Sequence, residues 1–433
     1  MHYYSLNHQS PIADFKTATI QGQAPDKGLY FPEYIPKLPA GFIENINSYS
    51  KEEIAFTAIQ PFVGDAIPTS LLEKIITETV NFNFPLVQVT DSISSLELFH
   101  GPTLAFKDVG ARFMSRCLNY FVQGNDQPIT VLVATSGDTG GAVASGFYEV
   151  EGINVVILYP SGKVSSVQEL QLTTLGKNIK AIEVEGNFDD CQNMVKQAFA
   201  DEVLNRKLFL TSANSINVAR WLPQQFYYFF AFQQWIDKAN PPVICVPSGN
   251  FGNICAGLLA YLQGLPVKHF IAAVNANDSV AKYIDSGLYQ SQPAVATISN
   301  AMDVGNPSNF VRILELFANK YPVIKSLISS YSISDEATKA TLKKVYETNN
   351  YLTDPHGAVA YAALEKYLTA YPADKGIFLE TAHPVKFYDV VEPITGEKVD
   401  VPIALKDILT KEKVSVKMKA DFKLLKENLM GSK

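Results

Sequence analysis

The chain has 433 residues, of which 47% are hydrophobic and 18% are charged, and its formal net charge is −7. This composition excludes an intrinsically disordered chain, and the length predicts two to three domains with a large buried core. The negative charge and a pI near 5.5 argue against nucleic-acid binding, because no broad positive field is available to neutralise phosphates.

The cysteines and histidines indicate neither a disulfide framework nor a metal site. No C-x-x-C spacing joins the four cysteines, which we expect to be buried thiols in a reducing compartment: Cys117, Cys191, Cys245 and Cys255. The six histidines are scattered without a ligand-like cluster. No apolar run approaches the roughly 20 residues of a membrane span, and MHYYSLNHQS lacks the features of a signal peptide. We therefore expect a soluble cytoplasmic protein.

Residues 1–95 begin with turns and continue as helices. The stretch GLYFPEYIPKLP is rich in proline, whereas KEEIAFTAIQPFV and SLLEKIITETV have apolar residues at helical spacing. Ser50 and Glu53 have the spacing of a capping box at the start of the first of these helices. We predict that residues 1–95 form an N-terminal helical domain, which acts as a lid or packs against the rest.

The next stretch, FHGPTLAFKDVGARF at 99–113, places Lys107 at or just before the start of a helix. Gly101 and Pro102 form a turn, and apolar residues recur at helical spacing after Asp108. Partial burial against Phe106 would disfavour the ammonium form of Lys107 and leave a nucleophilic amine. Such an amine can form a Schiff base with a carbonyl compound. An ordinary surface lysine is the alternative.

From there the pattern alternates between short apolar strands and helices, which predicts an α/β fold with two doubly wound parallel sheets. The expected strands are 129–135, 154–159, 180–185, 241–248, 268–275 and 376–381. We predict a smaller domain over 125–235 and a larger one over 96–124 and 236–433, with the ligand cleft between them. The lysine-rich last 24 residues are expected to form a solvated terminal helix instead of a membrane or polyanion site.

Glycine-rich turns follow two of these strands and lead directly into helices. The first is Ser136-Gly137-Asp138-Thr139-Gly140-Gly141, and the second is Gly249-Asn250-Phe251-Gly252-Asn253. Glycines let backbone N–H groups turn inward, and a helix N-terminus adds positive potential, so both turns are candidate anion sites. Neither matches the dinucleotide fingerprint or the triphosphatase loop. Tight strand-to-helix geometry is the alternative for each turn taken alone.

Thr381 ends the strand 376–381, and Pro384 prevents a helix from following at once. The Thr381 hydroxyl could be the partner of a heterocyclic nitrogen bound at the end of the strand. A neutral hydroxyl would not force that nitrogen to stay protonated. One ligand offers an aldehyde for Lys107, a phosphate for a glycine turn and a ring nitrogen for Thr381. That ligand is pyridoxal 5'-phosphate.

Several segments between residues 99 and 387 support this interpretation: FHGPTLAFKD, ATSGDTGGAV, KVSSVQELQLTTLG, GNFDDCQ, NSINVAR, VPSGNFGNICAG, MDVGNPSNF, DPHGAVAY and TAHPVKF. In these segments the chain resembles the threonine synthases, which are pyridoxal-phosphate enzymes of fold type II with a tryptophan synthase β-like fold. The likeness is greatest to the longer bacterial and fungal branch, which carries an N-terminal domain. FHGPTLAFKD and GNFGN together are highly specific.

The resemblance implies a role for particular residues. Lys107 would be the Schiff-base lysine, Phe106 would pack near the cofactor ring, and Thr381 would face the pyridine nitrogen. Asp138 stands where many relatives carry an asparagine beside the 3-hydroxyl, which leaves its protonation state open. The cofactor phosphate would be bound by Gly249, Asn250, Phe251, Gly252 and Asn253. The substrate carboxylate would be bound by Ser136 and Thr139, and its phosphate by Asn214, Ser215 and Arg220.

The implied reaction converts O-phospho-L-homoserine and water into L-threonine and phosphate, the last step of threonine biosynthesis, with Lys107 shuttling protons. A pyridoxal-phosphate serine or threonine dehydratase, or a related β-replacement lyase, is the nearest alternative. It would not need a second anion site. A homologue that binds the cofactor without turnover is another, and a nicotinamide-dependent oxidoreductase is disfavoured by the glycine turns. We expect a monomer or homodimer with no nucleic-acid or membrane partner.

Overall fold

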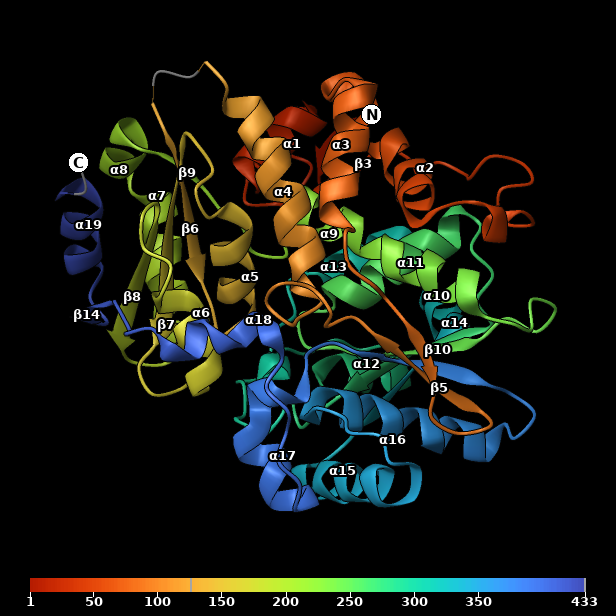
Figure 1. The fold of residues 1–433 in the computed structure, drawn as a ribbon. Helices are drawn as coiled ribbons and strands as arrows, with labels where there is room; N and C mark the ends of the chain where they lie inside the picture. The colour runs from red at the N-terminus through yellow and green to blue at the C-terminus, as the bar shows by residue number, and fades with distance from the viewer. Residues whose placement is uncertain (125–126, 432–433) are drawn as a thin grey trace.

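The computed structural model describes residues 1–124 and 127–431, which form three sheets and the helices that cover them (Figure 1). The six-stranded sheet has the order β12-β11-β10-β13-β5-β4, with bounds β4 Leu86–Gln88, β5 Ile93–Glu97, β10 Val243–Pro247, β11 His269–Val274, β12 Ile328–Ser332 and β13 Gly376–Glu380. The five-stranded sheet has the order β14-β8-β7-β6-β9, with bounds β6 Ile129–Ala134, β7 Ile153–Pro160, β8 Ile179–Glu185, β9 Phe209–Thr211 and β14 Val416–Lys419. The three-stranded sheet, β2-β1-β3, consists of β1 His2–Ser5, β2 Ala13–Asp14 and β3 Tyr30–Pro32.

The helices alternate with these strands along the chain. In its first half they are α1 Phe15–Gln21, α2 Lys51–Val63, α3 Thr69–Thr79, α4 Lys107–Val122, α5 Asp138–Phe147, α6 Ser166–Thr173, α7 Phe188–Ala200, α8 Glu202–Lys207 and α9 Val218–Trp221. In its second half they are α10 Phe226–Gln234, α11 Gly252–Gln263, α12 Ser279–Ser286, α13 Phe310–Leu316, α14 Tyr321–Leu327, α15 Asp335–Asn349, α16 Pro355–Ala370, α17 Tyr388–Thr395, α18 Ile403–Lys406 and α19 Phe422–Gly431. Within the described residues, none of the helices combines the length and apolar character needed to cross a membrane.

The six-stranded sheet is buried on both faces, as its continuous apolar strands predict. In β10, Val243 and Cys245 point into one hydrophobic cluster with α16, whereas Ile244 and Val246 point into another with α11. This alternation has the period of two that a strand imposes. The strands are parallel except β4, which pairs antiparallel with β5 at the edge. The predicted α/β class with parallel sheets is confirmed.

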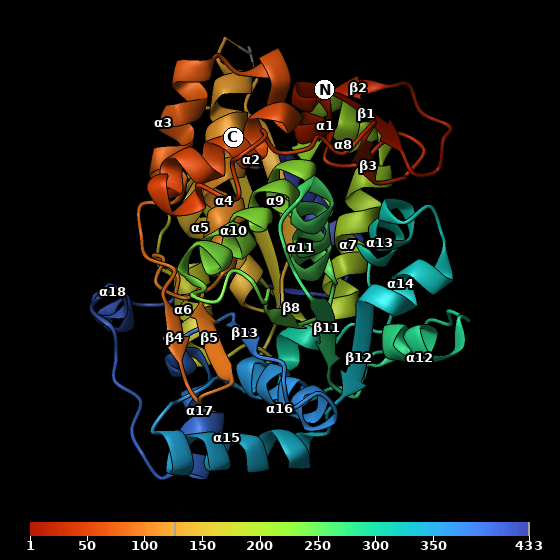
Figure 2. The same ribbon diagram turned by 90° about the vertical axis from the view of Figure 1, so that its right-hand side faces the viewer.

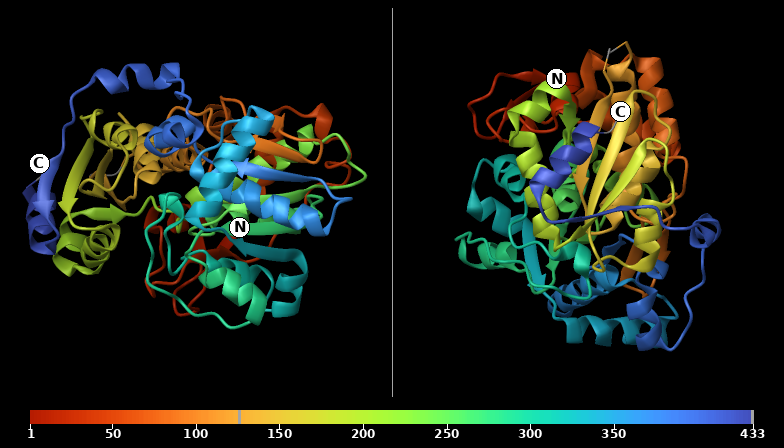
Figure 3. Two further views of the ribbon diagram at one scale, coloured as in Figure 1. Left: turned by 90° about the horizontal axis from the view of Figure 1, so that it is seen from below. Right: turned by 90° about the vertical axis from the view of Figure 1, so that its left-hand side faces the viewer.

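The five-stranded sheet also separates two layers of helices. One face packs against α4 and α5, and the other against α7 and α19. The C-terminal segment reaches this sheet from the side of α15–α17, and β14 pairs in parallel with β8 (Figure 3). The predicted terminal helix exists as α19, but it buries Leu425 and Leu429 instead of being solvated all round. Residues 416–431, assigned from sequence to the larger domain, therefore pack with the smaller sheet.

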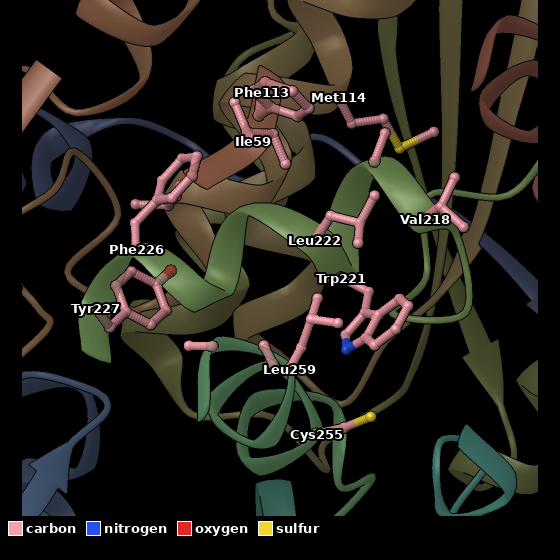
Figure 4. Close-up of a cluster of buried hydrophobic side chains, with 14 of the residues drawn as sticks. Ile59, Phe113, Met114, Val218, Trp221, Leu222, Phe226, Tyr227, Cys255 and Leu259 are labelled. Carbon is pink, nitrogen blue, oxygen red and sulfur yellow. The ribbon is translucent and has the colours of Figure 1, made fainter. Parts of the chain in front are cut away.

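The N-terminal segment shares its hydrophobic core with the rest of the chain. Its α2 begins with the capping box of Ser50 and Glu53 that the sequence predicts. Figure 2 shows α2 and α3 beside α4, with the small β1–β3 sheet at the same end of the molecule. In the interior, Ile59 of α2 lies in one cluster with Phe113 of α4 and Leu259 of α11 (Figure 4). The strands β4 and β5 belong to the six-stranded sheet, so the chain enters that sheet before residue 95.

Candidate active site

The loop before Lys107 is held by the segment that follows β13. The Phe106 N–H donates to the Thr381 carbonyl at 2.9 Å, and the His383 N–H donates to the Leu104 carbonyl at 3.0 Å. Leu104 has a positive φ of 57°, a strained conformation for a branched side chain. Helix α4 begins at Lys107 itself. The structure thus brings Lys107, Phe106 and Thr381 together, although Thr381 lies more than 270 residues further along the chain.

The amine of Lys107 is surrounded by apolar atoms and by other charges. Burial lowers its pKa to about 8; the carboxylate of Asp138 opposes this shift, and the cations of Arg220 and Lys386 add to it. A larger fraction of this amine is therefore uncharged at neutral pH than for an ordinary lysine. Its Nζ lies 5.7 Å from the centre of the Phe106 ring. These features suit a nucleophile and proton carrier.

Asp138, the first residue of α5, is buried and ionised. Burial alone would raise its pKa, but the ammonium groups of Lys386 and Lys107 outweigh burial and hold the pKa well below its usual range. Lys386 Nζ lies 2.7 Å from Asp138 Oδ1, and Gln168 Nε2 donates to the same oxygen at 2.8 Å. Lys386 also donates to the Thr103 carbonyl at 2.9 Å. The question of protonation left open by the sequence is answered in favour of the carboxylate.

The turn from Gly249 to Asn253 forms a concave N-terminus for α11. Phe251 precedes the helix in the left-handed conformation, with φ 59° and ψ 11°, and no side chain caps the first N–H groups. A Cβ on Gly249 would lie only 2.6 Å from Met302 Cα, so glycine is required there. Asn250 Nδ2 donates to Ser215 Oγ at 2.7 Å, which joins this turn to the predicted phosphate stretch. The geometry is that of an anion site.

The other glycine turn has a different construction. Thr135 Oγ1 accepts from the N–H groups of Gly137 and Gly140 at 3.0 and 2.8 Å, so the turn is braced from inside. Gly137 has a φ of 136°, which favours glycine, and no side chain caps α5. Ser136 and Thr139 are partly exposed on this turn. Their predicted contact with the substrate carboxylate stays a prediction.

Arg220 is buried without an ion-pair partner among residues 1–124 and 127–431. It donates to the Ala213 carbonyl, whereas its Nε and the Oδ1 of Asn214 are buried without a hydrogen-bond partner. Burial lowers the pKa of Arg220 to about 10, which still leaves the guanidinium charged at neutral pH. It packs against Gly110, one turn beyond Lys107 in α4. An ordinary structural ion pair would be the alternative to phosphate binding for Arg220. No such pair is present in the described part of the chain.

Sequence reasoning missed four residues that shape this site: Gln168, Asn309, Arg312 and Lys386. Lys386, Gln168 and Asn309 stand in segments that carry the resemblance, and the apolar residues around Lys386 in TAHPVKF are a further signal. Asn309 and Arg312 lie on α13 and its cap, where a polar residue and an arginine look like ordinary surface groups. Their burial is visible only in three dimensions.

The residues present fit pyridoxal phosphate. The uncapped N-terminus of α11 and the Gly249 turn suit its phosphate, Lys107 suits its aldehyde, and Thr381 lies beside both Phe106 and Lys107. The Nδ2 of Asn253 is buried without a partner and is free to serve this turn. No group of three or more His, Cys, Asp or Glu residues within the described ranges could hold a metal ion.

Family models agree with this geometry. The model of pyridoxal-phosphate dependent enzymes matches residues 94–379, that of the threonine synthase N terminus matches 2–80, and that of the threonine synthase C-terminal region matches 357–428. The chain belongs to the threonine synthase family. Its cofactor is pyridoxal 5'-phosphate, and its fold is that of the pyridoxal-phosphate enzymes of fold type II.

Individual relatives extend over the whole chain. The threonine synthase of Serratia marcescens is 44% identical over 100% of this chain and 99% of its own length, and that of Saccharomyces cerevisiae is 37% identical over 98% and 96%. The crystal structure of the Escherichia coli threonine synthase matches with a TM-score of 0.94 at 43% identity and covers 100% of both chains. A pyridoxal-phosphate-bound threonine synthase from Brucella melitensis matches with a TM-score of 0.91 at 34% identity, covering 99% and 98%.

Proposed function

We propose that this chain converts O-phospho-L-homoserine and water into L-threonine and phosphate. The observation that carries the proposal is Arg220, a charged guanidinium that is buried without an ion pair among the described residues and packs one turn from Lys107. A buried cation of this kind needs an anionic partner, and a phosphorylated substrate supplies one. The relatives that match over the full length of the chain are threonine synthases.

The bound cofactor would stabilise the negative charge that develops on substrate carbons during the reaction. Lys107 would hold the cofactor at rest and, once released, would move protons at the α and β carbons of the substrate. Its lowered pKa matches both tasks, because the amine can give or take a proton near neutral pH. The Thr381 hydroxyl would face the pyridine nitrogen of the cofactor. Because the hydroxyl is neutral, it would not force that nitrogen to be protonated.

The remaining residues would bind and orient. The turn from Gly249 to Asn253 would bind the cofactor phosphate, and Ser136 and Thr139 would hold the substrate carboxylate. Arg220, with Asn214 and Ser215, would hold the phosphoryl group that leaves. Asp138 would lie beside the cofactor's 3-hydroxyl as a carboxylate whose charge Lys386 balances. These assignments extend the resemblance to the positions that the site geometry supports.

A dehydratase acting on serine or threonine would need Lys107 but not Arg220. Replacing Arg220 by Ala should raise KM for phosphohomoserine about ten- to a hundredfold, because a charge-assisted hydrogen bond to phosphate is lost. Release of inorganic phosphate and formation of threonine by the purified holoenzyme test the proposal, with Lys107→Ala as the inactive reference. Turnover of serine at a rate unaffected by Arg220→Ala would favour the dehydratase instead.

The proposal includes a monomer or homodimer in the cytoplasm. Its support is indirect: Cys117, Cys191, Cys245 and Cys255 are all buried and free, as expected in a reducing compartment. Sedimentation of the purified chain measures the oligomeric state.

A further inference from the structure

Ser215 contacts two asparagine side chains whose orientations are fixed by chemistry. Asn250 Nδ2 lies 2.7 Å from Ser215 Oγ, and Asn309 Nδ2 lies 3.2 Å from the same oxygen. An amide could in principle present either its oxygen or its nitrogen to a hydroxyl. The second contact of each amide decides which of the two faces Ser215.

On one side, Asn250 Oδ1 accepts from the backbone N–H of Ser308 at 2.6 Å. On the other side, Asn309 Oδ1 accepts from Arg312 Nη1 at 2.7 Å. A backbone N–H and a guanidinium can only donate, so both amide oxygens are committed to them and both amide nitrogens face Ser215. A serine oxygen has two acceptor lone pairs and one hydrogen. With both lone pairs occupied, the Ser215 hydroxyl can act toward a ligand only as a donor.

Arg312 is the anchor of this arrangement. It is fully buried, stacks 4.4 Å from the ring of Trp221, and donates to the carbonyls of Ile216 and Tyr30 at 2.6 and 3.0 Å. Figure 4 shows Trp221 inside the hydrophobic cluster that fixes it. No carboxylate pairs with Arg312 in the described residues. Burial lowers its pKa to about 10, so it remains a cation at neutral pH and adds positive potential behind Ser215.

Ser215 also lies where phosphoryl groups are expected. A Cβ on Gly252 would be 3.3 Å from Asn309 Nδ2 and 3.6 Å from Ser215 Cβ, which places both residues beside the uncapped first turn of α11. Along the chain it belongs to the stretch that ends at Arg220. A Ser215 hydroxyl that cannot accept a hydrogen bond disfavours ligand groups that donate and favours an ionised oxygen as its acceptor.

We propose that Arg312 and Asn309 are positioning residues that, with Asn250, turn Ser215 into an obligate hydrogen-bond donor to a phosphoryl oxygen. This inference rests on the proposed function for the presence of a phosphoryl ligand. The phosphoryl oxygen could belong to the cofactor phosphate or to the substrate phosphate, since both accept the same hydrogen bond. In this proposal Arg312 acts by fixing the Asn309 amide, and Asn309 acts by donating to Ser215.

Asn309→Asp is the sharpest test because it keeps the shape and the contact with Arg312 but presents an acceptor to Ser215; it also removes the donation from Asn309 Nδ2 to the Asn250 carbonyl at 3.1 Å. The hydroxyl would then donate to the introduced carboxylate and be lost to the ligand. Ser215→Ala removes the donor directly and should weaken phosphoryl binding about ten- to a hundredfold. Asn309→Asp should weaken it at least as much, and adding Ser215→Ala to Asn309→Asp should cost nothing further.

The measurements are the Kd of pyridoxal phosphate for the cofactor-free chain and KM for phosphohomoserine, with pyridoxal as the ligand that lacks a phosphate. A loss confined to pyridoxal phosphate assigns Ser215 to the cofactor, and a loss confined to KM assigns it to the substrate; either supports the proposal. The cofactor arm works even if the chain does not make threonine, which separates the failure of this inference from that of the proposed function.

Asn178→Asp serves as the control for charge and lost donors, since Asn178 directly precedes β8 and donates to the Phe147 and Ile153 carbonyls. It should leave both constants unchanged. If Asn309→Asp does not fold, Ser215→Ala alone tests the donor through its effect on the two constants. Losses from Ser215→Ala and Asn309→Asp that add fully would overturn the proposal, because a charge effect would then explain Asn309. So would a Ser215→Ala chain that binds both ligands normally.

Discussion

The two glycine turns at the site are alike in sequence position but differ in what holds them. The turn before α5 is braced from inside by Thr135, and it brings a carboxylate, Asp138, to its helix. The turn before α11 is held from outside by Ser215, Ser308 and Asn309, which all bond to its Asn250, and no acidic residue stands in the first turn of its helix. The N-cap residue of neither helix supplies a side-chain cap, but in α5 Thr135 already takes the N–H of Gly140.

The difference indicates a division of labour. A turn without an acid, held by other loops, suits an anion that stays bound, the role that we propose for the cofactor phosphate. A turn whose carboxylate is balanced by Lys386 from another segment suits a ligand that comes and goes, because its charge balance does not depend on that ligand. The two turns follow strands of different sheets. The ion pair of Asp138 with Lys386 joins the turn before α5 to the segment that follows β13 of the six-stranded sheet.

The largest effect should come from breaking that link. Lys386→Met leaves the Asp138 carboxylate buried and unpaired, and should reduce the free energy of unfolding by about 3–5 kcal/mol. The double variant Lys386→Met with Asp138→Asn should recover most of this loss. Urea unfolding measures both. Lys344→Met, which breaks an exposed pair with Glu365, should cost at most about 1 kcal/mol; equal losses for the two lysines would contradict the role given to Lys386.

A pair of glycine substitutions sharpens the contrast between the turns. In Gly249→Ala the new Cβ meets backbone atoms, Met302 Cα at 2.6 Å and the Ala301 oxygen at 2.8 Å, so the turn must shift. Affinity for pyridoxal phosphate should fall about a hundredfold. Gly137→Ala strains a φ of 136° and displaces Gln168 from Asp138, which should raise the substrate KM more than the cofactor Kd. If Gly249→Ala mainly raised the substrate KM and Gly137→Ala mainly raised the cofactor Kd, the roles given to the two turns would be wrong.

The sequence predicted the parts of this site that local pattern controls. Lys107 follows from a turn, an apolar run and a helix start, and the glycine turns follow from strand, glycine and helix in order. Thr381 was placed by the end of its strand. Six strands of the two central sheets, β6, β7, β8, β10, β11 and β13, were found because parallel strands buried on both faces are continuously apolar. The shorter or more polar strands β4, β5, β9, β12 and β14 were missed.

What the sequence could not show depends on partners far away in the chain. Arg312 is identified as an anchor only by its contacts with Asn309, Trp221 and Tyr30, the last of which lies 282 residues away. The strand β14 has the alternation of a strand, Val416 and Met418 against two lysines, but it is only four residues long and stands in a lysine-rich stretch that was predicted to be helical. Its parallel pairing with β8 supplies the reason for its conformation. Burial of a charge is a property of the fold and leaves no trace in residue spacing.

The pH dependence of cofactor capture probes the side of the site near Lys107. The uncharged amine is the reactive form, so for a pKa of about 8 the capture rate should rise about tenfold per pH unit below 8 and level off above it. Stopped-flow absorbance of the cofactor-free chain mixed with pyridoxal phosphate measures the rate. A rate that still rises about tenfold per unit well above pH 8 would indicate an ordinary lysine and contradict the lowered pKa.

The smallest effect concerns a helix start outside the site. Ser50 caps α2 by accepting from the Glu53 N–H, unlike the free starts of α5 and α11. Ser50→Ala should lower the free energy of unfolding by about 1 kcal/mol and leave the cofactor Kd unchanged. Thermal unfolding and a binding titration check the two halves of this expectation. A change in cofactor affinity would mean that α2 is coupled to the site.

The central claim is that Lys107 holds the cofactor. Borohydride reduction of the holoenzyme followed by peptide mapping tests it most directly, because reduction fixes the cofactor to the lysine that carries it. We predict that the label lies on Lys107 alone, and that Lys107→Ala abolishes it without labelling Lys386, the fully buried lysine nearby. Label on Lys386 or on any other residue of the wild-type chain would contradict the claim.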